Sequence, residues 1–132
     1  MNNVTEKGKI LLVDDDKFLL DMYSMKFSAA GYAVEACVSG KEALDVLRAG
    51  FKPDTILLDL TMPELDGFAF LDILSQEKLA PKALRIALTN QSENTEKAKA
   101  VESGADRYIV KASMIPSEVV NTVEEELKKK RP

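Results

Sequence analysis

Short apolar runs alternate with longer amphipathic segments along the chain, and this alternation restricts the possible folds more than any other feature. Five runs have the length of strands, at 10–13, 32–38, 55–58, 83–88 and 107–110. The first is apolar without interruption, as expected for a strand buried on both faces. The segments that follow the runs have the apolar spacing of helices. Strands and helices alternating in this way predict an α/β domain, with a parallel five-stranded sheet covered by helices on both faces.

Capping residues mark the ends of several helices. Gly31 supplies a left-handed stop after the first helix, and Ser39 with Glu42 three residues later forms a capping box for the second. Ser92 is expected to cap the fourth helix, which carries few apolar residues. On the exposed side of the last helix we expect three i,i+4 ion pairs, Glu124–Lys128, Glu125–Lys129 and Glu126–Lys130.

The composition excludes several classes of function. Lys and Arg number 18 against 22 Asp and Glu, and the net charge of −4 argues against direct binding to nucleic acid or to an anionic membrane. No apolar run exceeds four residues, so we expect neither a membrane span nor a signal peptide. The chain has no histidine, which excludes serine–histidine and cysteine–histidine triads and imidazole–zinc sites.

Length and cysteine content predict one domain in a reducing compartment. The 132 residues suffice for a single domain over 1–132, with a core at about 8–130. Cys37 is the single cysteine and cannot form an internal disulfide, so the cytoplasm is the expected location.

Polar residues follow four of the five predicted strands. They are Asp14 and Asp15, Asp59, Thr89 and Lys111. Because the carboxyl ends of parallel strands share one edge of a sheet, these side chains are expected to converge there. Two carboxylates about 4 Å apart repel by about 4 kcal/mol at an effective dielectric near 20, and a hard divalent ion such as Mg²⁺ relieves that repulsion. Such a site suits phosphoryl transfer to a carboxylate, which gives an acyl phosphate.

These residues, in this order, resemble a response-regulator receiver domain of two-component signal transduction. The segment 57–67, with the sequence LLDLTMPELDG, carries the most specific part of the resemblance. The aspartates after the first strand, the threonine after the fourth and a lysine three residues after Tyr108 complete it. The resemblance covers nearly the whole chain and implies a flavodoxin-like (βα)5 fold with strand order 2-1-3-4-5.

The resemblance also implies the chemistry of the site. Asp59 would accept a phosphoryl group from a sensor histidine kinase or a phosphotransfer protein. Asp14, Asp15 and Asp59 would bind Mg²⁺ together with the backbone carbonyl of Thr61. Lys111 would pair with the phosphoryl oxygens. The chain would not be an enzyme for other substrates, because its chemistry is limited to its own phosphorylation and dephosphorylation.

The output implied by the resemblance is a conformational switch. Thr89 would move toward the phosphoryl group and Tyr108 would turn inward, which changes the surface of the fourth helix, fifth strand and fifth helix. That surface would control a downstream protein partner. We expect a stand-alone single-domain receiver, monomeric or weakly dimeric on phosphorylation, without direct contact to nucleic acid or membrane.

Two positions depart from the pattern of the family. Asn90 follows the threonine where the family usually has a small residue. Ala112 follows Lys111 where the family usually has a proline in a cis peptide. A cis bond before a residue other than proline costs about 3–4 kcal/mol, so we expect a trans bond with a local shift of the loop.

Three alternatives compete with this interpretation. The run from Asp14 to Asp16, taken alone, is more typical of helix capping than of a metal site. The same run also resembles the nucleophile motif of haloacid-dehalogenase-like phosphatases, with Asp14 as the nucleophile. Lys17 does not fit that motif, which also leaves Asp59 unexplained. A pseudo-receiver that no longer accepts phosphate is the third alternative.

Overall fold

A computed structural model of the chain describes residues 7–90 and 94–130, with the backbone alone at 94–96. A parallel five-stranded sheet in the order β2-β1-β3-β4-β5 forms its centre, as predicted. The strands are β1 (Lys9–Val13), β2 (Ala33–Cys37), β3 (Thr55–Asp59), β4 (Leu84–Thr89) and β5 (Arg107–Val110). The helices are α1 (Lys17–Ala29), α2 (Gly40–Arg48), α3 (Gly67–Glu77), α4 (Asn94–Glu102), the short 3₁₀ helix η1 (Lys111–Ser113) and α5 (Pro116–Lys130).

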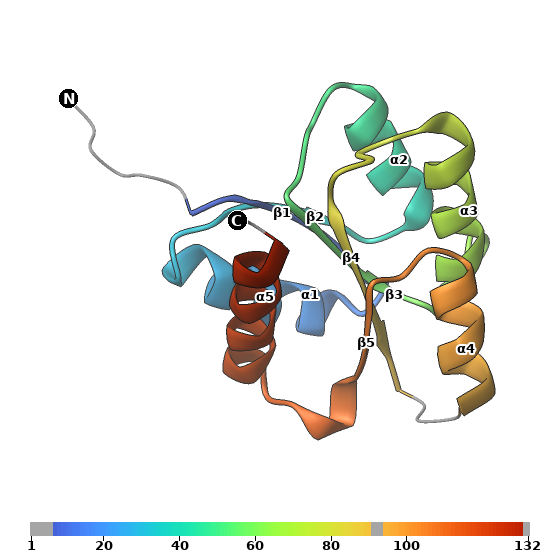
Figure 1. Ribbon diagram of the computed structural model, residues 1–132. Coiled ribbons are helices and arrows are strands. Elements are labelled where there is room, and N and C mark those ends of the chain that lie inside the picture. The colour runs from blue at the N-terminus through green and yellow to red at the C-terminus, as the bar shows by residue number, and fades with distance from the viewer. Residues whose placement is uncertain (1–6, 91–93, 131–132) are drawn as a thin grey trace.

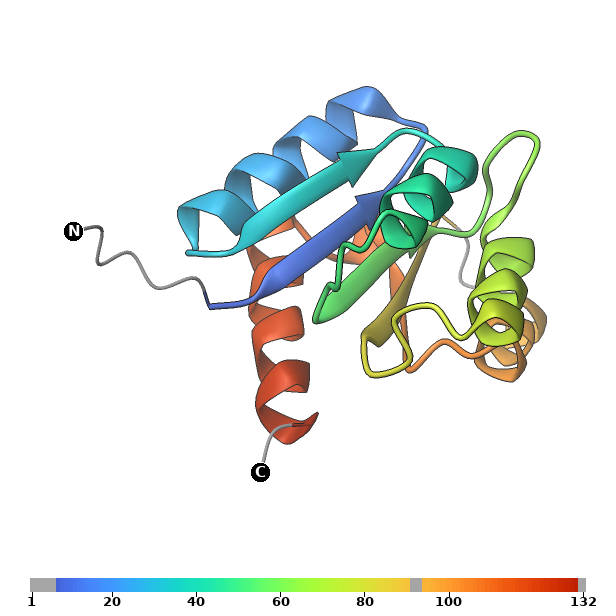
Figure 2. The ribbon, with the colours of Figure 1, turned by 90° about the horizontal axis from the view of Figure 1, so that it is seen from above.

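Helices cover both faces of the sheet. Figure 1 shows α1 and α5 on one side, and α2, α3 and α4 on the other. Because all strand pairs are parallel, the carboxyl ends of the strands share one edge of the sheet, and the view in Figure 2 shows the strands running side by side. Among the described helices, none combines the length and apolar character needed to cross a bilayer.

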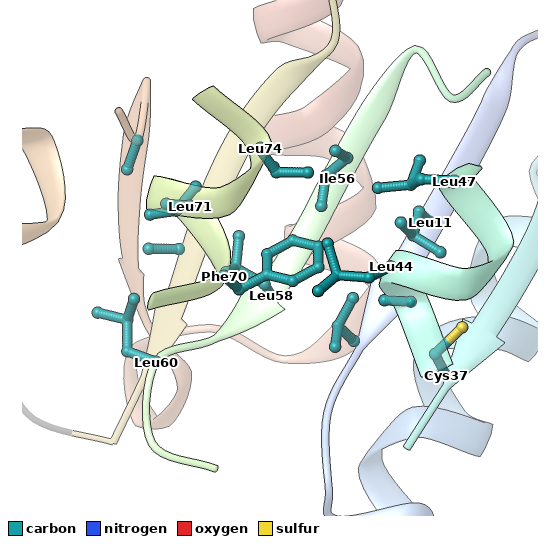
Figure 3. Close-up of a cluster of buried hydrophobic side chains, with 14 of the residues drawn as sticks. Leu11, Cys37, Leu44, Leu47, Ile56, Leu58, Leu60, Phe70, Leu71 and Leu74 are labelled. Atoms are coloured by element: carbon teal, nitrogen blue, oxygen red, sulfur yellow. The ribbon is translucent and has the colours of Figure 1, made fainter. Parts of the chain in front are cut away.

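Two apolar clusters hold the helices to the sheet, and successive residues of one strand belong to different clusters. In β1, Leu11 faces the side of α2 and α3, whereas Leu12 packs on the side of α1 and α5. Figure 3 shows the first cluster, in which Phe70 of α3 and Leu44 of α2 lie over Leu58 of β3. Burial on both faces explains why the first apolar run contains no polar residue.

Helix caps follow the predictions with one difference. Gly31 has a φ of 102°, the left-handed stop after α1. The Oγ of Ser39 accepts a hydrogen bond from the Glu42 N–H at 3.1 Å. The Glu42 carboxylate accepts from the N–H of Val38 at 3.4 Å, one residue before the cap, so the second bond of the capping box is displaced by one position.

The predicted bounds of the strands agree with the structure to about one residue. For α4 the predicted beginning cannot be compared in the same way. The second strand covers 33–37 rather than 32–38, and the fourth begins at 84 rather than 83. The predicted cap Ser92 lies outside the described residues. In α4, Ala100 is buried but Val101 is 55% exposed, so this helix has little apolar contact with the sheet.

None of the three i,i+4 ion pairs predicted along α5 occurs among the described residues, although the charge of Lys128 still acts on Glu124. Glu124 instead contacts Lys7 at 2.9 Å, and Glu126 contacts Arg107 at 2.7 Å, with Lys129 at 3.5 Å. Both glutamates are partly buried beside other segments of the chain, so cations from those segments are closer than the lysines four positions along the helix. The acidic side of α5 therefore supports tertiary structure, which a rule for isolated helices does not describe.

We predict that the core depends strongly on Phe70. Its side chain is fully buried, whereas that of Phe18 on α1 is 73% exposed. Phe70→Ala is expected to lower the free energy of unfolding by about 3–5 kcal/mol through lost burial and a cavity. The control Phe18→Ala should change it by less than about 0.5 kcal/mol. Urea denaturation followed by circular dichroism measures both values, and similar losses in the two variants would contradict the assigned core.

Candidate functional site

The predicted site residues meet at the carboxyl edge of the sheet. Asp14 follows β1, Asp59 and Thr89 end β3 and β4, and Lys111 follows β5. All four are buried, with at most 9% of each residue exposed, whereas Asp15 is exposed. Burial matters because charges removed from water interact more strongly with one another.

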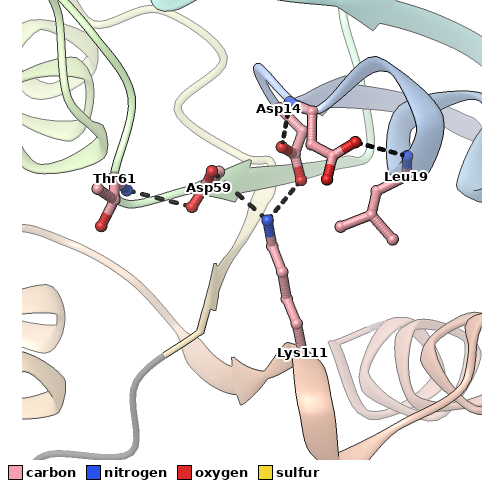
Figure 4. Close-up of polar contacts among 6 residues, drawn as sticks. Asp14, Leu19, Asp59, Thr61 and Lys111 are labelled. Carbon is pink, nitrogen blue, oxygen red and sulfur yellow. Dashed lines mark hydrogen bonds and ion pairs between the residues drawn. The ribbon is translucent and has the colours of Figure 1, made fainter.

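Lys111 joins the two buried carboxylates. Its Nζ lies 2.7 Å from Asp14 Oδ2 and 3.4 Å from Asp59 Oδ2, as the dashed lines in Figure 4 show. The described residues contain no cis peptide, so the Lys111–Ala112 bond is trans as predicted. The chain forms the one-turn helix η1 at this point, and the lysine still reaches both partners from it.

The run of three aspartates is divided between capping and the site. Asp16 caps α1, because its Oδ1 accepts a hydrogen bond from the Leu19 N–H at 3.2 Å. The Asp16 N–H donates in turn to Asp14 Oδ1 at 2.9 Å. The start of α1 thus fixes one oxygen of Asp14 while Lys111 binds the other. The capping interpretation is thus confirmed for Asp16, whereas Asp14 contacts Lys111 and its part in a metal site stays a prediction.

A loop folds tightly around Asp59. Its Oδ1 accepts from the Thr61 N–H at 3.1 Å. Gly67, the first residue of α3, donates its N–H to Leu60 O at 2.9 Å, and a Cβ at Gly67 would lie 2.7 Å from the Asp59 carbonyl oxygen. An Asp-Gly pair is typical of a turn, but the glycine at position 67 is needed because of this close approach to the end of β3.

The charges at the site shift the pKa values of its members. Burial raises the pKa of the Asp59 carboxyl to about 6; Lys111 and the Thr61 N–H oppose the shift, and Asp14 and Asp15 add to it. Burial works against the charged form of Lys111 too, but the hydrogen bond and charge of Asp14, with the charge of Asp59, outweigh it and raise the pKa of the ammonium. Burial therefore makes the ionised form of Asp59 costly even with Lys111 beside it.

Tyr23 is a neighbour of the site that the sequence did not identify. It lies buried on α1, and burial raises the pKa of its hydroxyl, with Lys111 lowering it and Asp14 and Asp59 raising it. Its position on the apolar side of a helix predicts packing alone, so no signal in the sequence distinguishes it from other core residues.

Thr89 and Tyr108 lie on the same face of the sheet. Tyr108 pairs with Ala87 across β4 and β5, and both belong to the cluster on the side of α2, α3 and α4. Leu88 belongs to the opposite cluster, so the alternation of β4 directs Thr89 to the same side as Tyr108. The two predicted switch residues therefore lie on the α4 side of the sheet, and their movement stays a prediction.

Comparison with known proteins identifies the family. The model for the response regulator receiver domain matches residues 10–124. The chain belongs to the response-regulator receiver family. The general function of this family is a phosphorylation-dependent switch in two-component systems, and its domains generally bind Mg²⁺. Because the chain belongs to the receiver family, it is not assigned to the haloacid-dehalogenase-like phosphatases.

Curated relatives are longer than the receiver domain. The probable transcriptional regulator ycf27 of Porphyridium aerugineum is 36% identical over 106 residues, which are 80% of this chain and 42% of that protein. The DNA-binding dual master transcriptional regulator RpaA of Synechocystis is 33% identical over 103 residues, which are 78% of this chain and 42% of that protein. The receiver therefore matches about two-fifths of the length of these relatives.

Solved structures confirm the fold. The CheY-like response regulator receiver domain protein from Methanospirillum hungatei superposes with a TM-score of 0.84 at 26% identity, covering 96% of this chain and 97% of that one. The receiver domain of the Francisella response regulator 1452 gives a TM-score of 0.83 at 29% identity, covering 95% and 100%. Superposition on these two solved structures thus shows that the receiver has the flavodoxin-like fold.

The carboxylates of the receiver fit a magnesium site. Oxygen atoms of Asp14, Asp15 and Asp59 lie within 4.8 Å of one another. Three carboxylate oxygens at such spacing suit a hard divalent cation, which also removes their mutual repulsion. The further ligand that the family resemblance implies, the carbonyl oxygen of Thr61, stays a prediction.

We predict that Asp15 both destabilises the metal-free receiver and supports Mg²⁺ binding. Asp15→Asn removes one exposed carboxylate from the cluster, so it should raise stability without divalent ions by about 0.5–1 kcal/mol, or a few degrees in Tm. Mg²⁺ should raise the Tm of the unmodified receiver through binding to the folded state, and Asp15→Asn should lose most of this increase. Thermal unfolding with EDTA or Mg²⁺ measures both effects.

The control is Asp72→Asn, an exposed aspartate in the middle of α3. It removes the same charge outside the cluster and should retain the full Mg²⁺ response. An equal Mg²⁺ response in Asp15→Asn and in the unmodified receiver would contradict the proposed ligand set.

Proposed function

We propose that this receiver is a signalling switch in which Asp59 accepts a phosphoryl group from a histidine of another protein, either a sensor kinase or a phosphotransfer protein. The observation that carries the proposal is the ammonium of Lys111 placed between the buried carboxylates of Asp14 and Asp59. The 132 residues contain no histidine, so the donor imidazole lies outside this receiver sequence.

Each residue of the site has a distinct part in the transfer. A carboxylate oxygen of Asp59 attacks phosphorus, the O–P bond forms as the N–P bond of the donor breaks, and the imidazole retains the electron pair. The Thr61 N–H holds Oδ1, which fixes the orientation of the carboxylate. Lys111 supplies positive charge for the oxygens of the incoming group. Mg²⁺ held by the three carboxylates would neutralise further negative charge during the transfer.

Hydrolysis of the acyl phosphate by water returns Asp59 to its starting state. The receiver on this account transforms no substrate other than its own side chain, so we propose that it is not an enzyme in the ordinary sense. A cytoplasmic location, next to its donor, remains a prediction.

The proposed output is a rearrangement of α4 with Thr89 and Tyr108. The apolar contact of α4 is small, and a cation–π contact between Lys99 and the ring of Phe68, at 4.5 Å, joins it to α3. A helix with so little apolar contact is among the elements that move most readily. A change from about 1:99 to 99:1 needs roughly 5.5 kcal/mol, which several charge-assisted hydrogen bonds to a phosphoryl group can approach.

The surface of α4, β5 and α5 would then bind a protein partner more tightly after phosphorylation. Two of the relatives are described as transcriptional regulators, one of them as DNA-binding. Because this receiver matches about two-fifths of their length and has a net charge of −4, we propose that it acts through protein contacts and not by touching nucleic acid itself.

We predict that a small phosphodonor labels Asp59. Incubation with acetyl phosphate and Mg²⁺ should add a phosphoryl group to the peptide that contains Asp59, and Asp59→Asn should abolish it. Asp66→Asn is the matched control, because Asp66 lies in the same loop, and asparagine retains its cap on α3. Peptide mass spectrometry maps the adduct. Labelling of Asp14 would support phosphatase-like chemistry, and a complete lack of labelling would support a pseudo-receiver.

We predict that the hydroxyl of Thr89 is needed for the response but not for phosphorylation. Thr89→Val keeps the shape of the side chain and removes the hydroxyl. With beryllofluoride and Mg²⁺, the unmodified receiver should show NMR shift changes over α4, β5 and α5, and Thr89→Val should lose most of them while Asp59 is still labelled by acetyl phosphate.

Thr55→Val is the control for the threonine variant. Its hydroxyl is buried at the opposite end of the sheet without a hydrogen-bond partner among the described residues, so its removal should leave the response intact and raise stability by about 1 kcal/mol. A full response in Thr89→Val would exclude the proposed role of the hydroxyl.

A further inference from the structure

A cleft of about 560 Å³ lies at the amino edge of the sheet, opposite the phosphoacceptor site. It is bounded by the chain segments that lead into β3 and β4, whose first residues, Thr55 and Leu84, are paired neighbours. Figure 2 shows these segments next to each other, where the chain enters the green and yellow strands. The volume is that of a small-molecule site.

The walls of the cleft are largely apolar. They include Leu47 from the end of α2, Phe51 and Pro53 from the segment before β3, and Leu79 and Pro81 from the segment before β4. Phe51 and Leu79 are partly buried and pack against the core cluster of Figure 3. The floor of the cleft is therefore continuous with the core, and an apolar ligand placed there would be removed from water on the side that faces the core.

The charges around the cleft are mainly positive. Lys52, Lys78 and Lys82 line it, all three are exposed, and none forms an ion pair with a described residue. Asp54 is the one carboxylate among the described lining residues, and its Oδ2 accepts a hydrogen bond from the Lys9 N–H at 2.8 Å. A local excess of cations on a chain of net charge −4 favours an anion at this place.

The two walls are held in position by a bidentate ion pair. Arg48 at the end of α2 contacts Glu77 at the end of α3 through Nε at 2.9 Å and Nη2 at 2.6 Å. The pair is exposed and adds little stability by itself, but it links the ends of the two helices beside the cleft. Lys78 and Ala80, with φ of 55° and 44°, take left-handed conformations that non-glycine residues adopt at an energetic cost. The left-handed residues 78 and 80 and the bidentate ion pair together indicate that the cleft has its shape before a ligand binds.

We propose that this cleft binds a small amphiphilic carboxylate, with its apolar body between the two walls and its carboxylate among the three lysines. The volume suits one small molecule, and a lysine is a point charge that requires no particular geometry from the anion. Binding of nucleic acid would instead call for successive aromatic platforms, and Phe51 is the one aromatic residue of the described lining. The site lies outside the phosphoryl-transfer machinery and does not depend on it.

The test uses naphthaleneacetate and its neutral counterpart naphthaleneacetamide, which share the same apolar body. Titrations are followed by amide NMR shifts of the receiver. Naphthaleneacetate should shift the signals of 50–54 and 78–83 and bind about tenfold more tightly than the amide. The triple variant Lys52→Gln, Lys78→Gln and Lys82→Gln should weaken naphthaleneacetate binding about tenfold and leave the amide unaffected.

A second triple variant, Lys26→Gln, Lys41→Gln and Lys97→Gln, changes the net charge equally at exposed positions outside the cleft and should bind naphthaleneacetate as the unmodified receiver does. Circular dichroism shows that both variants are folded. Equal affinity for the acid and the amide, an equal loss in the second variant, or shifts located elsewhere, such as at the exposed Phe18 and Met25, would each overturn the proposal. So would a complete lack of shifts up to the solubility limit.

Discussion

The receiver depends on the cost of burying carboxylates beside one another at the end of a sheet. Asp14 and Asp59 are almost fully buried, Asp15 is adjacent, and the ammonium of Lys111 offsets only one of the three negative charges. The remaining charge of −2 equals in size the charge of one divalent cation. The raised pKa of Asp59 has the same origin, because a buried carboxyl binds a proton more readily than it bears a charge. The uncompensated carboxylates therefore destabilise the folded receiver at this edge of the sheet. An ion or group that changes the charge there changes the stability of the site.

The packing of the core restricts the structural effect of a change of charge at the site to one part of the molecule. β1 and β3 are buried on both faces, so the backbone that carries Asp14 and Asp59 has no room to relax. The helix α4 differs, because Ala100 is the one buried apolar side chain among its described residues, with a cation–π contact from Lys99 in addition. Rigid strands that carry Asp14 and Asp59, beside a helix with little apolar contact, would direct a local change of charge toward α4 without requiring the whole domain to move.

The sequence predicted those features that depend on local patterns. Short apolar runs identified the strands. The polar residues after these runs identified the site, because the carboxyl ends of parallel strands lie at the same edge of the sheet. Features that depend on tertiary contacts were not accessible. Glu124 and Glu126 pair with Lys7 and Arg107 from other segments, and not with the lysines four positions along α5. Asp14 and Asp16 take different parts because α1 begins at Lys17, which makes Asp16 its cap. The need for glycine at position 67 likewise comes from the approach of α3 to Asp59, which no local rule contains.

The two ends of the sheet are too far apart to influence each other through electrostatics alone. The five residues of β3 span about 17 Å, well beyond the Debye length of about 8 Å at physiological ionic strength. Packing nevertheless joins them. The helix α3 begins at Gly67 against the carbonyl of Asp59, and the residue that follows its last turn, Lys78, lines the amino-edge cleft. A ligand in that cleft would act on phosphoryl transfer only by displacing α3 as a rigid body. The fully buried side chains of Phe70, Leu71 and Leu74 oppose such a displacement, so the geometry favours two sites that function independently.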